Sequence, residues 1–123
     1  MTKRILIVDD EADVREITKL GLEMGTDWTV LTASSGKDAL AIAASEAPDA
    51  ILLDMMMPDM DGRATLQSLK ADATTQSIPV IFVTAKARQS NLEDFKELGV
   101  AGVVAKPFRP LKLAAEISKI LGW

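Results

Sequence analysis

The sequence predicts an α/β fold in which one parallel β-sheet is covered by helices on both faces. Short apolar segments alternate with segments of helical periodicity along the whole chain, which is typical of successive right-handed βαβ units. The apolar segments show little alternation of polar and apolar residues, as expected of strands that are buried on both faces. Most of these segments end at a charged or hydroxyl-bearing residue, so the sequence also marks the carboxyl edge of the sheet.

Five strands and five helices are expected, in alternation. The strands are predicted over residues 4–8, 28–32, 50–53, 79–83 and 100–105. The first helix follows Glu11 and stops at Gly25, and near-helical spacing predicts a buried face made of Val14, Ile17, Gly21 and Met24.

The remaining helices have recognisable starts or ends. Ser35-Gly36-Lys37-Asp38 opens the second, which Pro48 closes, and residues 63–71 form the third, with Leu66 and Leu69 buried. Ser90 and Glu93 have capping-box spacing and start a fourth helix that ends near Gly99. Pro110 begins the fifth, whose apolar face is formed by Leu113, Ala114, Ile117, Ile120 and Leu121.

Composition limits the possible functions. The 123 residues suit one domain over positions 1–123, with no linker or second domain expected. A net charge of −4 argues against nucleic-acid binding, and no apolar run is long enough to span a membrane. The sequence has no cysteine and no histidine, which excludes thiolate and histidine-dependent catalysis and leaves carboxylates and lysines for any chemistry. A cytoplasmic protein is expected.

Polar residues at the strand ends predict one site. Asp9 and Asp10 follow the first strand, Asp54 the third, Thr84 the fourth and Lys106 the fifth. Each alone is compatible with a solvated loop residue. Open α/β sheets, however, bind ligands in the crevice at the carboxyl ends of their strands, so we expect the five side chains to meet there.

The residue types at this edge favour phosphoryl chemistry. Three converging carboxylates repel one another unless one is protonated or a cation is bound, and a few hard oxygen ligands with room for water suit Mg²⁺. Such a metal and Lys106 could together neutralise a phosphoryl group, and the carboxylate of Asp54 is a competent nucleophile toward phosphorus.

The combination of motifs resembles the receiver domain of two-component response regulators. The resemblance spans the whole chain. Within this family the chain resembles the single-domain, chemotaxis-regulator-like type, which has no output domain. The motifs that carry it are, in order, Asp9-Asp10, Leu53-Asp54-(x)2-Met57-Pro58-(x)3-Gly62, Thr84-Ala85 and Lys106-Pro107-Phe108.

The resemblance implies a flavodoxin-like, doubly wound (βα)5 sandwich with strand order 2-1-3-4-5. It implies that Asp54 is the phosphoacceptor and binds Mg²⁺ together with Asp10 and the backbone carbonyl of Met56, while Asp9 acts through water. Thr84 would hydrogen-bond the phosphoryl group.

The resemblance also assigns the lysine and its neighbours. Lys106 would pair with the phosphoryl group, and its peptide bond to Pro107 is expected to be cis. The family often has an aromatic residue three positions before this lysine that couples phosphorylation to the surface; here the position is Val103, so that coupling is in question.

The partners implied are a histidine kinase or histidine phosphotransfer protein as phosphodonor, and a downstream protein that binds the face formed by the fourth helix, fifth strand and fifth helix. The missing histidines agree with an external donor. The protein would be a signalling switch and not an enzyme acting on other substrates, although it takes part in its own phosphoryl transfer and autodephosphorylation.

Three alternatives differ in what they require. A phosphorylation-independent pseudo-receiver would be favoured by a missing acid or lysine, and all are present. An aspartate-nucleophile phosphatase of the haloacid dehalogenase type needs a second aspartate where this chain has Met56. A flavin-binding module needs a hydroxyl-rich phosphate loop after the first strand, where Asp9-Asp10-Glu11 would instead repel phosphate.

Overall fold

The computed structural model describes residues 3–57, 60–84 and 99–123. Its centre is a five-stranded sheet of order β2-β1-β3-β4-β5 in which every neighbouring pair is parallel. This confirms the predicted flavodoxin-like α/β fold. The strands are β1 (Arg4–Val8), β2 (Thr29–Ala33), β3 (Ala50–Asp54), β4 (Val80–Thr84) and β5 (Gly102–Ala105).

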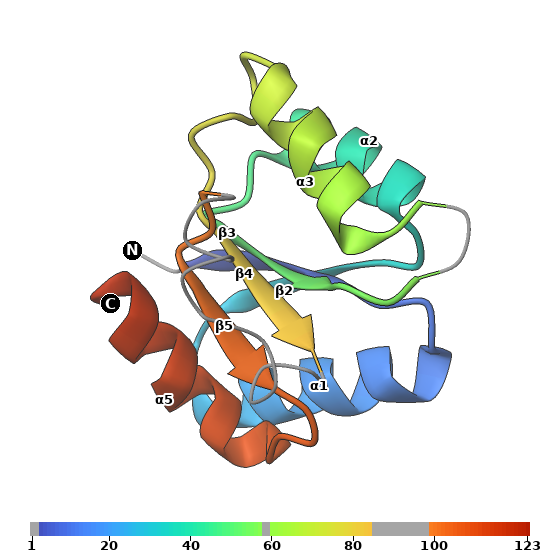
Figure 1. Cartoon of the computed structure of the whole chain (residues 1–123). Coiled ribbons are helices and arrows are strands. Elements are labelled where there is room, and N and C mark those ends of the chain that lie inside the picture. The colour runs from blue at the N-terminus through green and yellow to red at the C-terminus, as the bar shows by residue number, and fades with distance from the viewer. Residues whose placement is uncertain (1–2, 58–59, 85–98) are drawn as a thin grey trace.

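Helices cover both faces of the sheet. Helices α2 and α3 pack on one face, and α1 and α5 pack on the other (Figure 1). The helices in the described residues are α1 (Ala12–Gly25), α2 (Gly36–Glu46), α3 (Gly62–Ala71) and α5 (Pro110–Leu121). The helix expected between Ser90 and Gly99 lies almost wholly outside the described residues.

Strand side chains alternate between two buried clusters, one on each face of the sheet. Leu6, Leu53 and Phe82 belong to the cluster that Leu66 and Leu69 of α3 complete. Ile7 and Leu52 belong to the other, which is completed by residues of α1 and α5. Because both faces of the sheet are covered, the three central strands β1, β3 and β4 are apolar over most of their length, as the sequence indicated.

Polar groups define several helix ends. The side chain of Ser35 accepts a hydrogen bond from Asp38 N at 3.1 Å and caps α2, and Asp61 caps α3 by accepting from Ala64 N at 2.9 Å. At the other end of α2, Ala47 takes a left-handed conformation with φ of 46° and leads the chain into β3.

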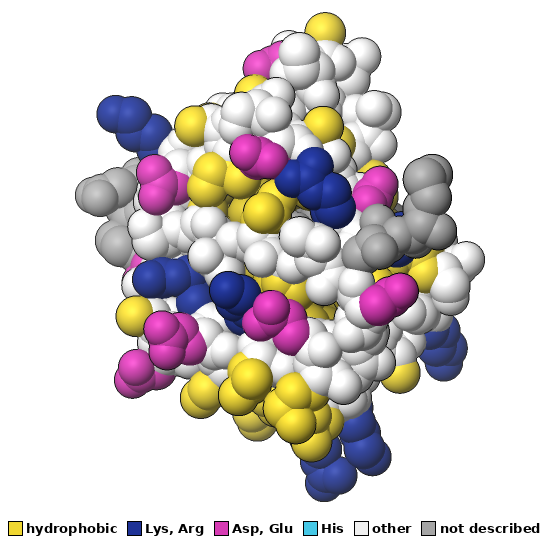
Figure 2. Space-filling view, turned by 180° about the vertical axis from the view of Figure 1, so that it is seen from behind, with side chains coloured by type: hydrophobic (Ala, Val, Ile, Leu, Met, Phe, Trp, Pro, Cys, Tyr) yellow, Lys and Arg dark blue, Asp and Glu magenta, His cyan; other side chains and the backbone are white. Residues whose placement is uncertain are grey.

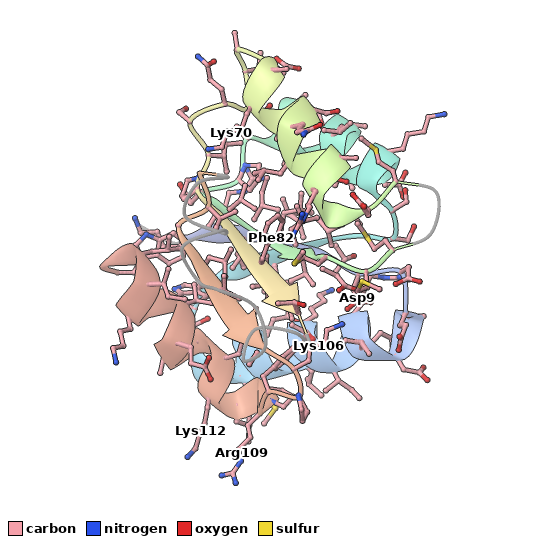
Figure 3. All side chains as sticks on the ribbon, in the orientation of Figure 1. Asp9, Lys70, Phe82, Lys106, Arg109 and Lys112 are labelled. Carbon is pink, nitrogen blue, oxygen red and sulfur yellow. The ribbon has the colours of Figure 1, made fainter. Side chains whose placement is uncertain are left out.

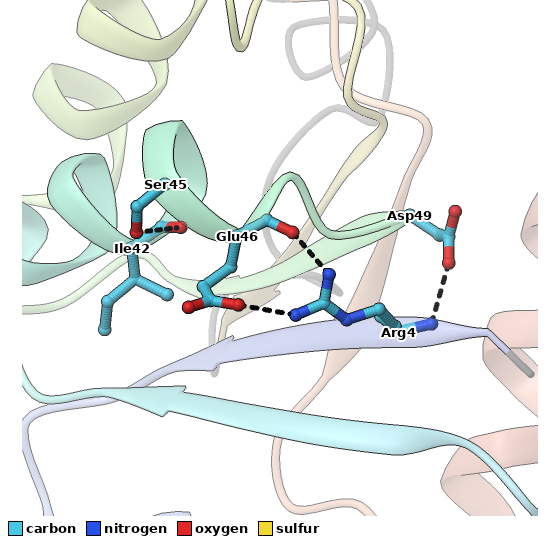
Figure 4. A network of polar contacts seen from close by, with 5 residues as sticks. All are labelled: Arg4, Ile42, Ser45, Glu46 and Asp49. Carbon is cyan, nitrogen blue, oxygen red and sulfur yellow. Dashed lines mark hydrogen bonds and ion pairs between the residues drawn. The ribbon is translucent and has the colours of Figure 1, made fainter.

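Arg4 joins the start of β1 to the end of α2 (Figure 4). Its guanidinium donates to the Glu46 carbonyl at 2.6 Å and pairs with the Glu46 carboxylate at 2.7 Å. Its own backbone N–H donates to the carboxylate of Asp49 at 2.7 Å. The contact satisfies a carbonyl at the helix end and fixes the amino-terminal edge of the sheet, opposite the predicted site.

The predicted buried face of α1 is partly wrong. Ile17 and Met24 are 56% and 68% exposed, whereas Thr18, Gly21 and Leu22 are buried. The reason is the close packing of α1 on α5, where a Cβ on Gly21 would lie 2.6 Å from the Cβ of Pro110. The helix therefore turns its small residue inward and leaves Ile17 and Met24, together with Leu20, in solvent. Within the described residues, no helix has both the length and the apolar character needed to cross a bilayer.

Candidate functional site

Strand alternation brings three of the predicted residues to one side of the sheet. Asp54 is the last residue of β3, in register with Val83 of β4, and Asp9 follows directly after β1. Asp9 continues the side of Ile7, and Asp54 the side of Leu52, both of which face α1 and α5. Lys106 follows β5 and continues the side of Val104, which faces α1 and α5 as well. The two acids and the lysine therefore converge on one side of the sheet.

The charged groups are close together. Lys106 Nζ lies 3.4 Å from Asp54 Oδ1 and 3.5 Å from Asp9 Oδ2. Carboxylate oxygens of Asp9, Asp10 and Asp54 all lie within 4.8 Å of one another. Asp9 and Asp54 are each only 4% exposed, and Asp10 is exposed. Figure 3 shows Asp9 and Lys106 beside each other at the carboxyl end of the sheet.

Asp9 is held at its main chain as well as at its carboxylate. Its N–H donates to the Ala33 carbonyl of β2 at 3.2 Å, and its carbonyl accepts from Arg15 Nη1 at 2.8 Å. Its Oδ1 accepts from Glu11 N at 2.9 Å. The loop between β1 and α1 is therefore fixed at several atoms and presents Asp10 to solvent.

The loop after Asp54 is closed by a glycine. Met55 N donates to the Val83 carbonyl at 3.1 Å, and Gly62 N donates to the Met55 carbonyl at 3.0 Å. A Cβ on Gly62 would lie 2.7 Å from Met55 Cα and 2.8 Å from the Asp54 carbonyl oxygen, so no other residue fits without moving this backbone. Pro58, which belongs to the same motif as Asp54 and Gly62, lies outside the described residues.

The pKa of Asp54 is raised above its ordinary value of 3.8. Burial is the main cause, and the nearby carboxylate of Asp9 acts in the same direction. The hydrogen bond from Met56 N at 3.2 Å and the charge of Lys106 oppose the rise in the pKa of Asp54. The carboxylate is thus held in a poorly solvated position, and among the described residues Lys106 is the cation paired with it.

The donor set fits a divalent cation. When ionised, the three carboxylates carry more negative charge than the Lys106 ammonium and the Arg15 guanidinium on the Asp9 carbonyl balance, so the described residues leave a net negative charge at the cluster. The ligands are hard oxygens, and the exposed position of Asp10 leaves room for water, as Mg²⁺ requires. The side chain of Met56 is 64% exposed, and the direction of its carbonyl remains a prediction.

Thr84 is the last residue of β4 and is 1% exposed. It is in register with Ala105 of β5, and its carbonyl accepts from Lys106 N at 3.0 Å, which ties the two predicted residues through the backbone. The peptide between Lys106 and Pro107 is cis, as expected. Ala85 and Lys86, which follow Thr84, lie outside the described residues.

A groove opens beside the lysine. It has a volume of about 390 Å³ and lies between α1 and the β5–α5 connection, with Val14, Ile17, Lys106 and Phe108 among its lining residues. The exposed apolar residues Ile17, Leu20 and Met24 continue from it along α1, and Figure 2 shows hydrophobic side chains gathered at the lower edge of the molecule. The groove of about 390 Å³ beside Lys106, without the exposed residues Leu20 and Met24, is called the α1 groove below.

Two contributions were missed from sequence alone. Arg15 binds the carbonyl of Asp9, and the only signal for this was its position on the helix that follows the acidic loop. Ile17 and Met24 were assigned to the core, because their spacing is that of a buried helix face, whereas both are exposed. In both cases the rotation of α1 decides the outcome.

Comparisons with known proteins agree on one family. A family model described as "Response regulator receiver domain" matches residues 5–118. The chain is 40% identical over 119 residues to the phosphate regulon transcriptional regulatory protein PhoB of Pseudomonas aeruginosa, covering 97% of this chain and 52% of that protein. The chain thus spans about half the length of the first curated relatives it matches.

Solved structures give the same result. Chemotaxis response regulator CheY4 of Vibrio cholerae matches with a TM-score of 0.88 at 26% identity, covering 98% of this chain and 99% of that one. A putative response regulator from Chloroflexus aurantiacus matches with a TM-score of 0.87 at 31% identity, over 100% of both chains.

Proposed function

The chain belongs to the response regulator receiver domain family of two-component signalling, and from this membership we propose that phosphorylation of Asp54 switches its binding to a partner protein. The observation that carries the proposal is the cluster at the sheet edge. A buried carboxylate with a raised pKa lies 3.4 Å from Lys106 and within reach of two further acids. If one of these groups were absent, family membership would support phosphorylation of Asp54 less strongly.

The proposed reaction is transfer of a phosphoryl group from a phosphohistidine to Asp54. A carboxylate oxygen of Asp54 forms a bond to phosphorus while the P–N bond breaks, and the imidazole leaves as the neutral base after taking up a proton. The product is an acyl phosphate, which water later hydrolyses. Lys106 would bind a phosphoryl oxygen as a point charge, and Thr84 would donate a hydrogen bond to another.

Mg²⁺ is the proposed cofactor. Asp10, Asp54 and the Met56 carbonyl would hold it directly, with Asp9 acting through water. When bound, the ion would neutralise charge that develops on the transferred group. The chain's own residues keep the acids together without it, because Lys106 bridges Asp9 and Asp54.

The proposed donor is a histidine kinase or histidine phosphotransfer protein, and the α1 groove is where its histidine-bearing segment would dock. The groove adjoins Lys106 and offers Val14, Ile17 and Phe108 for apolar contact. A downstream protein would bind the face that includes β5 and α5, although the fourth helix expected there lies outside the described residues. A phosphorylation-independent interaction module is the alternative, and the complete set of acids and lysine disfavours it.

Incubation with each of two phosphodonors in separate samples tests this proposal. The protein is incubated with Mg²⁺ and either a phosphorylated histidine kinase domain or phosphoramidate, a small donor that also carries a P–N bond. We expect an acyl phosphate at Asp54 from both, identified by its cleavage with hydroxylamine. A kinase panel and phosphoramidate that both leave Asp54 unmodified would favour the interaction module.

A further inference from the structure

We infer that Arg15 is a positioning residue that raises the affinity of the acidic cluster for a divalent cation by holding the peptide between Asp9 and Asp10. The inference deepens the proposed function and rests on its magnesium site. It begins from one contact, the hydrogen bond of 2.8 Å from Arg15 Nη1 to the Asp9 carbonyl oxygen.

This contact fixes the direction of Asp10. A peptide unit is planar, so the orientation of the Asp9 carbonyl also sets the orientation of the Asp10 N–H and of the backbone that carries the Asp10 side chain. Asp9 is already held by Ala33 and Glu11 at its N–H and carboxylate. Arg15 supplies the remaining backbone restraint, at the point where the chain passes to an exposed acid.

The position of Arg15 on α1 makes the restraint rigid. Arg15 N donates to the Glu11 carbonyl at 3.0 Å in the first turn of the helix, and the Arg15 side chain is half-buried. Its guanidinium therefore reaches back over the loop from a fixed base. Groups that orient metal ligands in this way commonly change affinity by about tenfold or more when they are removed.

Charge alone predicts the opposite effect. A guanidinium beside three carboxylates repels an incoming Mg²⁺, so if Arg15 acted only through its charge, its removal would tighten metal binding. If it acts by holding the peptide, its removal weakens metal binding, because Asp10 then samples orientations that do not face Asp9 and Asp54. The sign of the change separates the two roles.

The test is calorimetric titration of the unphosphorylated protein with Mg²⁺, beside the Mg²⁺-induced rise in its thermal midpoint. The loss variants are Arg15→Met and Arg15→Gln, which are both uncharged and shorter than arginine; the first is apolar and the second is polar. Arg15→Lys is the rescue variant, since it restores a donor and a charge. Lys19→Met is the matched control, because it removes a positive charge from an exposed position one turn further along α1.

We expect the Kd for Mg²⁺ to rise about tenfold in Arg15→Met and Arg15→Gln and to recover in part in Arg15→Lys, with Lys19→Met unchanged or slightly tighter. Unchanged or tighter binding in whichever loss variant folds would overturn the inference and leave the proposed function intact. A wild-type protein that binds no Mg²⁺ would overturn the magnesium part of the proposed function and this inference with it. Phosphoryl incorporation is measured separately, so the two failures are distinguishable.

Discussion

Lys106 Nζ lies 3.4 Å from Asp54 Oδ1, and the same ammonium group lies 3.5 Å from Asp9 Oδ2. The lysine is about a quarter exposed, whereas both carboxylates are buried, so it brings a solvated charge to the edge of a poorly solvated pair. It partly offsets the cost of burying Asp54 and stands where a transferred phosphoryl group would need a cation.

Lys106→Met is predicted to slow phosphorylation of Asp54 by at least about tenfold, because a charge that stabilises the transferred group is lost. The same substitution removes a cause that lowers the pKa of Asp54, so the reaction should require a higher pH than in the wild type. The measurement is the rate of phosphoryl incorporation from acetyl phosphate as a function of pH. Lys112→Met, at an exposed position on α5, is the control and should match the wild type.

Asp54→Asn is predicted to stabilise the protein at neutral pH by about 1 kcal/mol, because a buried charge is replaced by a neutral group of similar shape. The pKa of Asp54 is raised in the folded state, so the folded protein binds a proton more tightly than the unfolded chain does. The ionised carboxylate therefore costs stability above that raised pKa.

As the pH falls through the raised pKa of Asp54 toward the ordinary value of 3.8, the stability difference between Asp54→Asn and wild type should shrink and then vanish. Urea denaturation of both proteins across this pH range measures it. A stability difference that stays constant with pH would show that the gain does not come from the charge of Asp54.

Gly62→Ala is predicted to destabilise the fold by about 2 kcal/mol, because its Cβ would lie 2.7 Å from Met55 Cα and 2.8 Å from the Asp54 carbonyl. The displaced backbone carries Asp54, so the rate of phosphorylation should fall as well. Gly25→Ala is the matched control. Its Cβ would meet only Ala114 Cβ, at 4.0 Å, and the change should stabilise α1 by about 0.5 kcal/mol. Equal free energies of unfolding for the two variants would contradict the proposed role of Gly62.

Ile17→Glu is predicted to separate protein donors from small ones. Ile17 is 56% exposed and lines the α1 groove, so the free energy of unfolding should change by less than about 0.5 kcal/mol. Phosphoryl transfer from a histidine kinase should fall about tenfold through lost apolar contact, while transfer from acetyl phosphate is unchanged. Met24→Glu, at an exposed apolar position further along α1, should have the smaller effect on kinase transfer.

The fold and most of the site could be predicted from sequence because both follow from strand patterning. Parallel strands end at one edge, so Asp9, Asp54 and Lys106 could be grouped before their distances were known. The exposure of Ile17 could not be predicted, because it depends on how closely Gly21 approaches Pro110 of α5. The hydrogen bond from Arg15 to the Asp9 carbonyl depends on the same helix rotation, and spacing along the chain does not report it.

We propose above that Asp54 accepts a phosphoryl group in a metal-dependent reaction. Intact-mass spectrometry after incubation with acetyl phosphate tests it most directly, with Mg²⁺ present or removed by chelation and with Asp54→Asn beside the wild type. We predict a gain of one phosphoryl group by the wild type with Mg²⁺, and none in either control. A folded wild-type protein that gains nothing in excess Mg²⁺, or a gain that persists in Asp54→Asn, would contradict it.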